Sequence, residues 1–542
     1  MKKKLITFSF IFCFFLQNFA QTQADYPKLV VGIVIDQMRW DYLYRFYERY
    51  GNDGFKRLLS QGFSCENTML NYIPTYTAIG HSSIYTGSVP SIHGIAGNDF
   101  IRQQTGEWVY CSQDTSVKAV GIPDCKAGKM SPKNLQTTTI TDELKLATNF
   151  RSKVIGVAIK DRGSILPAGH AADAAYWYNG DSGKWITSTF YRRDLPDWLQ
   201  KFNAEKNPST RYLEQDWNTL FPLESYVQSS QNLEYEKNFN DEKGVFPLKL
   251  KNLSEKKKNS LITETPFGNT MTLDVAKLAV ENEQLGTDEI ADFLAISLSS
   301  TDYIGHRFGI NSAKIEDCYL RLDRDLADFL KFLDEKVGEN NYTLFLSADH
   351  ACAHNAKFLQ DKRIPAGIFN DNEICKKLNI YLQNIYKKEN IVKTLNNYQV
   401  NFDYEVIKNI PHEELIKNCV EFLEKDSAIQ YVVEMKNAAQ SSLPQAVKER
   451  IINGYNREFS GEIQIIVKPA FYHDSKTEGC THGTWNPHDS HIPLLFFGKN
   501  IPYGATNREV YMTDIAPTLA ALLKIQMPNG CIGKPIEEVL KK

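Results

Sequence analysis

Six short apolar runs, each ending at a polar residue or a glycine, constrain the fold of this chain more than any other feature. They are KLVVGIVID (28–36), SKVIGVAIKD (152–161), DFLAISLSSTD (292–302), YTLFLSADH (342–350), EIQIIVKP (462–469) and HIPLLFFG (491–498). Continuous runs rich in β-branched residues, without polar alternation, are typical of strands buried on both faces. We therefore predict an α/β fold with a mostly parallel sheet sandwiched by helices.

Helical patterns lie between these runs. In DEIADFLAISL (288–298) and CYLRLDRDLADFLKFLDEKVG (318–338) the apolar residues recur at intervals of three and four. The first overlaps the run 292–302, so both a strand and a helix are predicted there. Near the end of the chain, TDIAPTLAALLKI has Thr513 as a candidate N-cap and Pro517 in the first turn, where a missing N–H is tolerated.

Two segments lack this alternation of apolar runs and helical patterns. Residues from about 170 to 270 are rich in Tyr, Trp, Asn and Lys, and residues from about 365 to 460 are lysine-rich and helical in pattern. We expect both to be insertions in a single catalytic domain spanning residues 21–542. They either cap the site or decorate the surface without a role in chemistry.

The first twenty residues carry the pattern of a secretory signal peptide. Three lysines precede an apolar run that ends near the small residue Ala20. A membrane anchor is the alternative, but the run is shorter than the ~20 apolar residues that a spanning helix needs. Cys13 lies inside the run rather than just after it, which argues against a lipoprotein. We predict cleavage of residues 1–20, a periplasmic location and no stable membrane anchor.

The net charge bears on the binding partners of the chain, and the cysteine content bears on its disulfide bonds. The net charge of -3 gives no electrostatic reason to expect nucleic acid, which normally selects a basic face. We expect a monomer that acts on small molecules. Of ten cysteines, nine follow Ala20, and none has a CxxC spacing. Cys65 and Cys111 are one candidate disulfide pair, although a sequence does not define connectivity.

Acidic residues and a histidine follow three of the apolar runs. Asp36 ends the first run, Asp302 ends another, and Asp349 with His350 ends a third. Ligands of open α/β sheets bind outside the carboxyl ends of the strands, so these side chains are expected to converge. An aspartate after a strand is also a common turn former or helix cap. The prediction of a binding site therefore depends on the meeting of these side chains at one sheet edge and not on any one residue.

Two further histidines complete a candidate metal centre. His306 follows Asp302 by four residues, which places both on one side of a helical turn. His482, in THGTWNPHDSH, precedes the last apolar run. Three aspartates and three histidines suffice for two adjacent sites of mixed nitrogen and oxygen ligation, which suits zinc.

Other residues compete for the same roles. The doublet continues as DHACAH, so Cys352 and His354 are alternative ligands, and His488 and His491 compete with His482. His491 is also a candidate for a hydrogen bond to a metal ligand.

Thr77, in PTYTAIGHSSIYTG (74–87), is a candidate nucleophile. A threonine hydroxyl is too weak at neutral pH and needs an adjacent base or a metal. The alternative is a helix N-cap hydroxyl, and the two roles are compatible.

The order of these residues resembles that of the alkaline phosphatase superfamily, which includes nucleotide pyrophosphatase/phosphodiesterases and sulfatases. His482-Gly483 and the tail DIAPTLAALLKIQMPNGCIGKPI resemble the superfamily too. The resemblance implies two Zn²⁺ ions that activate Thr77, a transient phosphothreonine, and its hydrolysis by water. It also implies the ligands: Asp36, Asp349, His350 and Thr77 for one zinc, and Asp302, His306 and His482 for the other.

Three more residues bear on the substrate. Asn98, in GIAGNDF, is placed like an asparagine shared by superfamily members with a threonine nucleophile. Lys160 and Arg162 are two apart at the end of a predicted strand, so they are expected to point the same way. Two cations aimed at one spot suit the dianion of a phosphate monoester. The alternative is a solvated pair of charges at a strand end.

These residues resemble the phosphate-irrepressible, PafA-type alkaline phosphatases. The stretch TAIGH lacks the Cys/Ser-x-Pro-x-Arg motif of sulfatases. The leading hypothesis is therefore a periplasmic zinc phosphomonoesterase. The alternatives are a nucleotide pyrophosphatase/phosphodiesterase on the same fold, or a non-catalytic protein that binds metal or phosphate.

Overall fold

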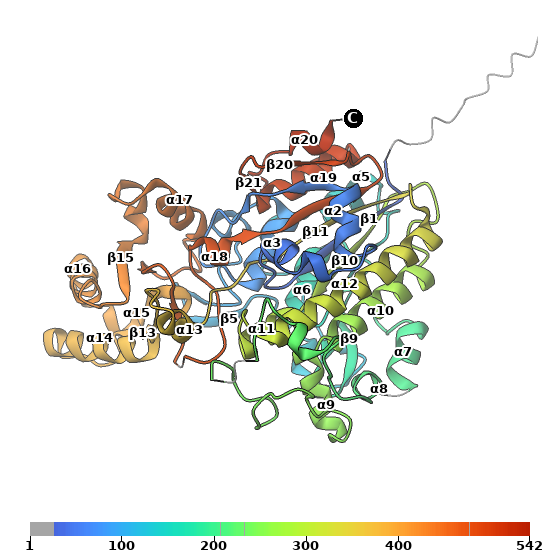
Figure 1. Cartoon of the computed structure of the whole chain (residues 1–542). Coiled ribbons are helices and arrows are strands. Elements are labelled where there is room, and N and C mark those ends of the chain that lie inside the picture. Colours follow the sequence, from blue (N-terminus) through green and yellow to red (C-terminus); the bar gives the residue numbers. More distant parts are fainter. Residues whose placement is uncertain (1–25, 206, 232–233, 476, 542) are drawn as a thin grey trace, which may run out of the picture.

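The computed structural model describes residues 26–205, 207–231, 234–475 and 477–541 (Figure 1). The predicted signal peptide, residues 1–20, lies outside the described residues. Within the described ranges, no helix is both long enough and apolar enough to cross a bilayer.

A ten-stranded sheet forms the centre of the molecule. At its middle, β1 pairs in parallel with β10 on one side and with β11 on the other. β7 and β8 continue the parallel order, whereas β19 runs antiparallel to β11. The predicted mostly parallel sheet is confirmed. In spatial order the strands are β20 (Gly504–Thr506), β2 (Phe63–Cys65), β19 (Leu494–Gly498), β11 (Tyr342–Ser347), β1 (Leu29–Ile35), β10 (Asp292–Leu298), β7 (Val154–Ala158), β8 (Ala174–Asn179), β9 (Lys184–Ser188) and β6 (Ala119–Val120).

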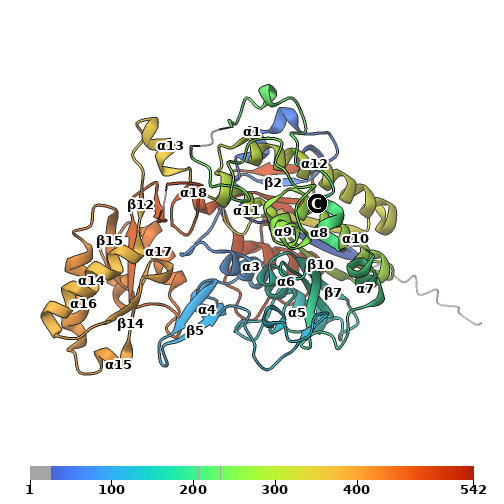
Figure 2. The same ribbon diagram turned by 90° about the horizontal axis from the view of Figure 1, so that it is seen from below.

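Helices cover both faces of this sheet (Figures 1 and 2). α3 (Thr77–Thr86), α6 (Asp161–Ala168) and α19 (Ile515–Leu523) belong to one layer. α10 (Phe267–Asn282) and α12 (Ala313–Leu333) belong to the other. Strands covered in this way must be apolar on both faces, which explains the continuous runs in the sequence.

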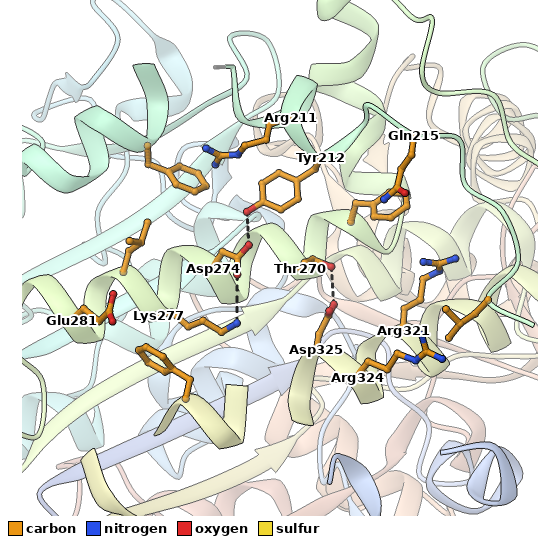
Figure 3. A pocket seen from close by; sticks show the side chains of 15 residues that line it. Arg211, Tyr212, Gln215, Thr270, Asp274, Lys277, Glu281, Arg321, Arg324 and Asp325 are labelled. Atoms are coloured by element: carbon orange, nitrogen blue, oxygen red, sulfur yellow. Dashed lines mark hydrogen bonds and ion pairs between the residues drawn. The ribbon is translucent and has the colours of Figure 1, made fainter. Parts of the chain in front are cut away.

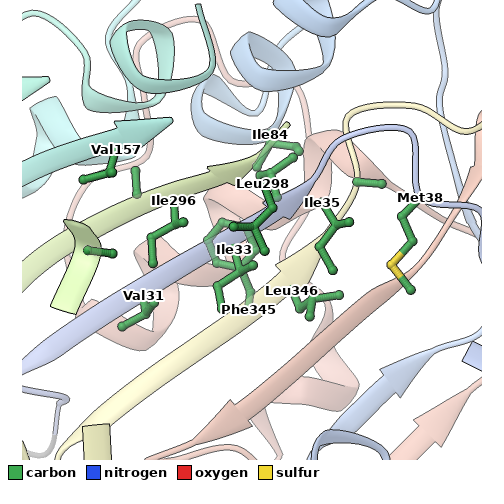
Figure 4. Close-up of a cluster of buried hydrophobic side chains, with 14 of the residues drawn as sticks. Val31, Ile33, Ile35, Met38, Ile84, Val157, Ile296, Leu298, Phe345 and Leu346 are labelled. Atoms are coloured by element: carbon green, nitrogen blue, oxygen red, sulfur yellow. The ribbon is translucent and has the colours of Figure 1, made fainter. Parts of the chain in front are cut away.

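The core lies between the sheet and these layers (Figure 4). Ile33 and Ile35 of β1, Ile296 of β10, Leu346 of β11 and Ile84 of α3 are all buried. Burying such a side chain contributes roughly 1.5–3 kcal/mol. This packing fixes the strand ends that carry the polar residues described below.

A second lobe projects beside the sheet and has its own apolar core (Figure 2). It contains helices α14 (Asp371–Tyr386) and α16 (His412–Leu423). The run 462–469 forms β16 (Ile463–Val467) here, antiparallel to β14 (Gln399–Phe402) and β15 (Ile429–Glu434). The prediction that this run joins the central sheet is wrong, because the second lobe buries the strand instead.

The segment from about 170 to 270 contributes to the central sheet as well as to its surroundings. It begins with β8 and β9, which extend the sheet beyond β7. Only after β9 does the chain leave the sheet, through α7 (Asp197–Ala204), α8 (Pro208–Tyr212) and α9 (Glu255–Leu261).

Three local predictions need correction. Residues 292–298 are strand β10, so the helical interpretation of 288–298 is wrong; every residue of the strand is buried and its periodicity carries no information. Thr513 lies in a 3₁₀ turn and Asp514 is the N-cap of α19, with Pro517 in the first turn as predicted. Cys65 pairs with Thr506 of β20, whereas Cys111 lies beside Asn98 and Ser112, and the two sulfurs are not bonded, so the suggested pairing is wrong.

Candidate active site

The carboxyl ends of β11, β1 and β10 bring three aspartates together. Asp36 directly follows β1, and Asp349 follows β11 by two residues. Asp302 lies in the first turn of α11 (Ser300–Phe308), just after β10. All three are at most 3% exposed. The predicted convergence at this sheet edge is confirmed.

Two groups of side chains at this edge are spaced to hold a metal ion. One is Asp36, Asp349 and His350, and the other is Asp302, His350 and His482, each with its ligand atoms within 4.8 Å of one another; the predicted ligand His306 belongs to neither group. His350 is shared because its ring stacks on that of His482 at 3.5 Å between centroids.

Unpaired carboxylate oxygens show that a cation fits the first group. Asp36 Oδ1 and Asp349 Oδ2 are buried and accept no hydrogen bond from the described residues. Burial and the neighbouring Asp36 raise the pKa of Asp349 well above its usual range. Buried carboxylates without partners are costly unless a metal or another cation compensates them. The donor set of carboxylates and imidazoles matches zinc chemistry.

The three histidines present the same ring nitrogen to the centre. Each has Nδ1 within hydrogen-bonding distance of a backbone carbonyl oxygen, which turns Nε2 toward the aspartates and Thr77. The distances are 2.8 Å from His306 to Cys480, 3.0 Å from His350 to Ala351 and 2.6 Å from His482 to Thr75.

Protonation states favour ligation for two of these rings. Burial lowers the pKa of His350 to about 4 and that of His482 well below its ordinary value, so both are neutral at neutral pH. Burial acts in the same direction at His306, but Asp302 outweighs it and raises its pKa to about 9. His306 Nε2 lies 3.1 Å from Asp302 Oδ1, which confirms the predicted proximity on one helical turn.

Thr77 is the first residue of α3, and Tyr76 is the N-cap. Thr77 is therefore not the capping hydroxyl. Its Oγ1 lies 3.4 Å from His350 Nε2, beside the first group. Gly80, one turn later, permits this approach: a Cβ there would lie 2.2 Å from the carbonyl oxygen of Asp349.

Asn98 lies in the loop before β4 (Asp99–Arg102) and reaches the same helix. Its Oδ1 accepts a 3.0 Å hydrogen bond from the Ala78 N–H. The side-chain amide is thereby fixed at the N-terminus of α3, which is favourable for anions.

Lys160 and Arg162 are not part of an extended segment. β7 ends at Ala158, Lys160 is the N-cap of α6, and Arg162 lies in its first turn. The premise that they project alike as strand neighbours is wrong. Lys160 Nζ donates to Asp36 Oδ2 (2.7 Å) and Asp302 Oδ2 (2.6 Å).

Arg162 has a donor left over. Its Nη1 donates to Tyr110 Oη at 3.2 Å, whereas its Nε is buried without a partner among the described residues. Such an unsatisfied charged donor is a candidate for an anionic ligand.

The competing residues lie elsewhere. Cys352 Sγ contacts Cys480, and His354 Nδ1 contacts Asn311 Oδ1 at 2.9 Å. His491 stacks on Trp40, and its Nε2 lies 3.0 Å from the carbonyl oxygen of Glu66. His488 lies near Thr484 and Asp489. None of the four joins the two described metal groups.

Two residues that the sequence analysis did not predict, Gln37 and His81, contact the candidate ligands and Thr77. The Gln37 backbone N–H donates to Asp349 Oδ1 (3.1 Å), and its Nε2 donates to Asp302 Oδ1 (2.5 Å). His81 lies between Thr77 O and Ser297 Oγ, 2.9 Å from each. The only sequence feature that could have pointed to Gln37 is its position directly after Asp36. No sequence feature pointed to His81.

A polar pocket of about 180 Å³ lies where the second lobe meets the N-terminus of α3. Tyr76 and Asn98 line one side, and Phe369, Asn397 and Tyr398 line the other. A larger cavity of about 850 Å³, between α8, α10 and α12, shares no residue with the metal groups (Figure 3).

The chain belongs to the type I phosphodiesterase / nucleotide pyrophosphatase family, whose model matches residues 30–490. Within this family it is similar to an alkaline phosphatase. It is 49% identical to alkaline phosphatase PafA of Elizabethkingia meningoseptica, over 95% of this chain and 94% of that protein. It matches the crystal structure of PafA with a TM-score of 0.93, over 95% of this chain and 99% of that one.

Two further comparisons are informative. A protein of Myroides odoratus named calcium-transporting ATPase is 56% identical over 98% of both chains. A solved PafA variant with substitutions at a threonine, an asparagine, a lysine and an arginine is 48% identical, with a TM-score of 0.92, over 95% of this chain and 99% of that one. Those four residues are spaced along PafA as Thr77, Asn98, Lys160 and Arg162 are spaced here.

Proposed function

We propose that this chain is an exported, zinc-dependent alkaline phosphatase that hydrolyses phosphate monoesters through a phosphothreonine at Thr77. The observation that carries the proposal is the position of Thr77 Oγ1, 3.4 Å from His350 Nε2 and beside buried carboxylate oxygens that lack partners. The similarity to PafA over nearly the whole chain supports the same activity.

Lys160 contacts one of the ligands proposed for each of two Zn²⁺ ions, Asp36 for the first and Asp302 for the second. Bound zinc supplies a Lewis acid that lowers the pKa of an oxygen nucleophile and stabilises charge in the transition state. The buried, neutral imidazoles of His350 and His482 and the unpaired carboxylate oxygens favour such ions. We assign Asp36, Asp349, His350 and Thr77 to one ion, and Asp302, His306 and His482 to the other.

The reaction proceeds through two displacements. The Thr77 hydroxyl gives up its proton, Oγ1 attacks phosphorus, the bond from phosphorus to the ester oxygen breaks, and that oxygen takes up a proton as the alcohol leaves. Water then attacks the phosphothreonine, the bond from phosphorus to Oγ1 breaks, a proton of the water returns to Oγ1, and inorganic phosphate is released.

Three groups are proposed to hold the phosphoryl oxygens. An ammonium has three donors, and Asp36 and Asp302 engage two of those of Lys160, which leaves one for substrate. Arg162 Nε is unpaired, and Asn98 is anchored through Oδ1 with its amide nitrogen still able to donate. Two cations favour the dianion of a monoester over the single charge of a diester.

A nucleotide pyrophosphatase/phosphodiesterase is the second candidate, because the family model itself carries that description. It would use the same metals, Thr77 and Asn98, and would gain less from Lys160 and Arg162. A non-catalytic metal- or phosphate-binding protein is the third, and it predicts metal content without turnover. The name of the Myroides relative also implies hydrolysis of a phosphate bond; we do not propose transport for this chain.

The remaining parts of the proposal concern the whole chain. We propose that residues 1–20 are a cleaved signal peptide, that residues 21–542 form one catalytic domain, and that the mature enzyme is a periplasmic monomer. Its proposed partners are small phosphate monoesters, with no role for nucleic acid.

Trapping the covalent intermediate tests the proposal. The mature protein is mixed with a monoester, quenched in acid within a turnover, digested, and examined by mass spectrometry. We expect phosphate on Thr77 and none on Thr75 in the same peptide. Turnover with no phosphate on Thr77 would overturn the mechanism.

A further inference from the structure

Two buried cysteines lie sulfur to sulfur beneath the metal-binding loops. The Sγ atoms of Cys352 and Cys480 are 2.7 Å apart, and neither residue is exposed. This distance is well inside the roughly 3.5–4 Å at which non-bonded heavy atoms pack. Among the nine described cysteines, no other pair is recorded in contact.

The backbones on either side already hold the pair together. The Ala353 N–H donates to the Thr481 carbonyl oxygen at 3.2 Å, one residue beyond each cysteine. Cys352 Sγ also lies 3.2 Å from that same oxygen. The two segments therefore run side by side, and the sulfurs need to approach only from 2.7 Å to the S–S bond length of about 2.05 Å.

We propose that Cys352 and Cys480 form a disulfide in the mature enzyme. The two thiols lose two protons and two electrons, and a disulfide-bearing thiol oxidase or a small-molecule disulfide is reduced to two thiols in exchange. Because both sulfurs are fully buried in the folded chain, the bond forms while the chain folds. Export, as proposed above, supplies a compartment in which such a bond persists.

The bond would clamp the metal-binding segments. Cys352 lies two residues after His350, and Cys480 lies two residues before His482. The Cys480 carbonyl oxygen is also the partner of His306 Nδ1, at 2.8 Å. One covalent link thus joins the segments that orient all three histidines. It closes a long stretch of chain, because the two cysteines are separated by 128 in sequence, and this restricts the unfolded state strongly.

Thiol counting tests the bond directly and does not depend on catalysis. Protein from the exported fraction is unfolded in guanidinium chloride and alkylated with N-ethylmaleimide without reductant. Its mass is then compared with that of a reduced sample. We expect two fewer adducts than the nine of the reduced mature chain, and a tryptic species that links the two cysteine peptides. Nine adducts, in this sample and after refolding with oxidised glutathione, would overturn the proposal.

The clamp is tested by zinc release. In Cys352→Ala/Cys480→Ala, zinc should pass to a chromogenic chelator about tenfold faster than in the unaltered enzyme. Cys318→Ala/Cys419→Ala, which removes two buried thiols elsewhere, is the matched control and should release zinc at the unaltered rate. Equal release from the two double variants would contradict the clamp.

Discussion

Lys160 Nζ donates a 2.7 Å hydrogen bond to Asp36 Oδ2, so a candidate substrate-binding residue and a candidate metal ligand are directly joined. The same ammonium donates to Asp302, which belongs to the other metal group. Burial opposes its charge, but Asp302 and Asp36 outweigh this effect and raise the pKa of Lys160. The lysine therefore stays charged at alkaline pH.

Lys160→Ala should lower the kcat for a phosphate monoester by roughly 10²–10³-fold, the usual loss for one preorganised donor. Hydrolysis of a diester should fall by less, because its single charge gains less from the cation. Zinc content, measured by elemental analysis, should be unchanged. The control is Lys145→Ala, which removes a buried ammonium paired with Asp173 away from the site. Equal losses on both substrates would contradict the assignment.

Thr77→Ala should reduce monoester turnover by roughly 10³–10⁶-fold, because no other described side chain takes the place of its hydroxyl. Thr77→Ser should keep a measurable part of the rate, since it retains an oxygen nucleophile. Steady-state kinetics with matched zinc content checks both. A Thr77→Ala enzyme with near-normal kcat would show that the nucleophile is another group.

Gly80→Ala should be harmful although alanine favours helices. The new Cβ would lie 2.2 Å from the Asp349 carbonyl oxygen and 2.6 Å from its Cβ, so α3 and this candidate ligand must separate. A misplacement of about 1 Å costs on the order of 10²-fold in rate. At Gly180 a Cβ would have ordinary contacts, with the nearest atom at 3.7 Å, so Gly180→Ala is the control. Unchanged kcat in Gly80→Ala would contradict the close contact.

Asp325→Asn should stabilise the protein mainly at alkaline pH. Burial raises the pKa of Asp325 to about 7. The hydrogen bond from Thr270 lowers this pKa and the charge of Asp274 raises it, but both effects are smaller than that of burial (Figure 3). A raised pKa means that stability is full below the unfolded value, near 4, and is lost as pH rises through about 7. The variant avoids this loss, so its Tm should exceed that of the unaltered protein by about a degree or more at pH 9.

At pH 5.5 the gain in Tm should be smaller, because the unaltered carboxyl is still protonated in the folded state. Thermal unfolding of both proteins at the two pH values provides the comparison. An equal gain at both would show that the charge of Asp325 is not the cause.

The sequence predicted the parts of the site that depend on strand ends. Asp36, Asp302 and Asp349 follow apolar runs, and parallel strands carry their carboxyl ends to one edge. An apolar run could not show whether residues 462–469 belong to the central sheet or to the second lobe, because a buried strand has the same apolar pattern in either core. Lys160 and Arg162 were found by residue type, but their orientation was not, since β7 ends at Ala158 and α6 begins at Asp161, so the two residues are not in one extended segment.

The supporting contacts were not predictable for a different reason. The oxygen atoms near His306, His350 and His482 Nδ1 are backbone carbonyls, which any residue type supplies. Gln37 and His81 act through tertiary contacts, and a single sequence does not show which residues meet. The Cys352–Cys480 contact was likewise invisible, because the cysteines are far apart in the chain.

The most direct test of the central claim is the ratio of kcat/KM for p-nitrophenyl phosphate to that for bis-p-nitrophenyl phosphate. It is measured at alkaline pH on the mature protein before chelation, after chelation, and after zinc return. The account predicts a monoester preference of several orders of magnitude, lost on chelation and restored by zinc. A preference for the diester, or full activity in the chelated protein, would contradict it.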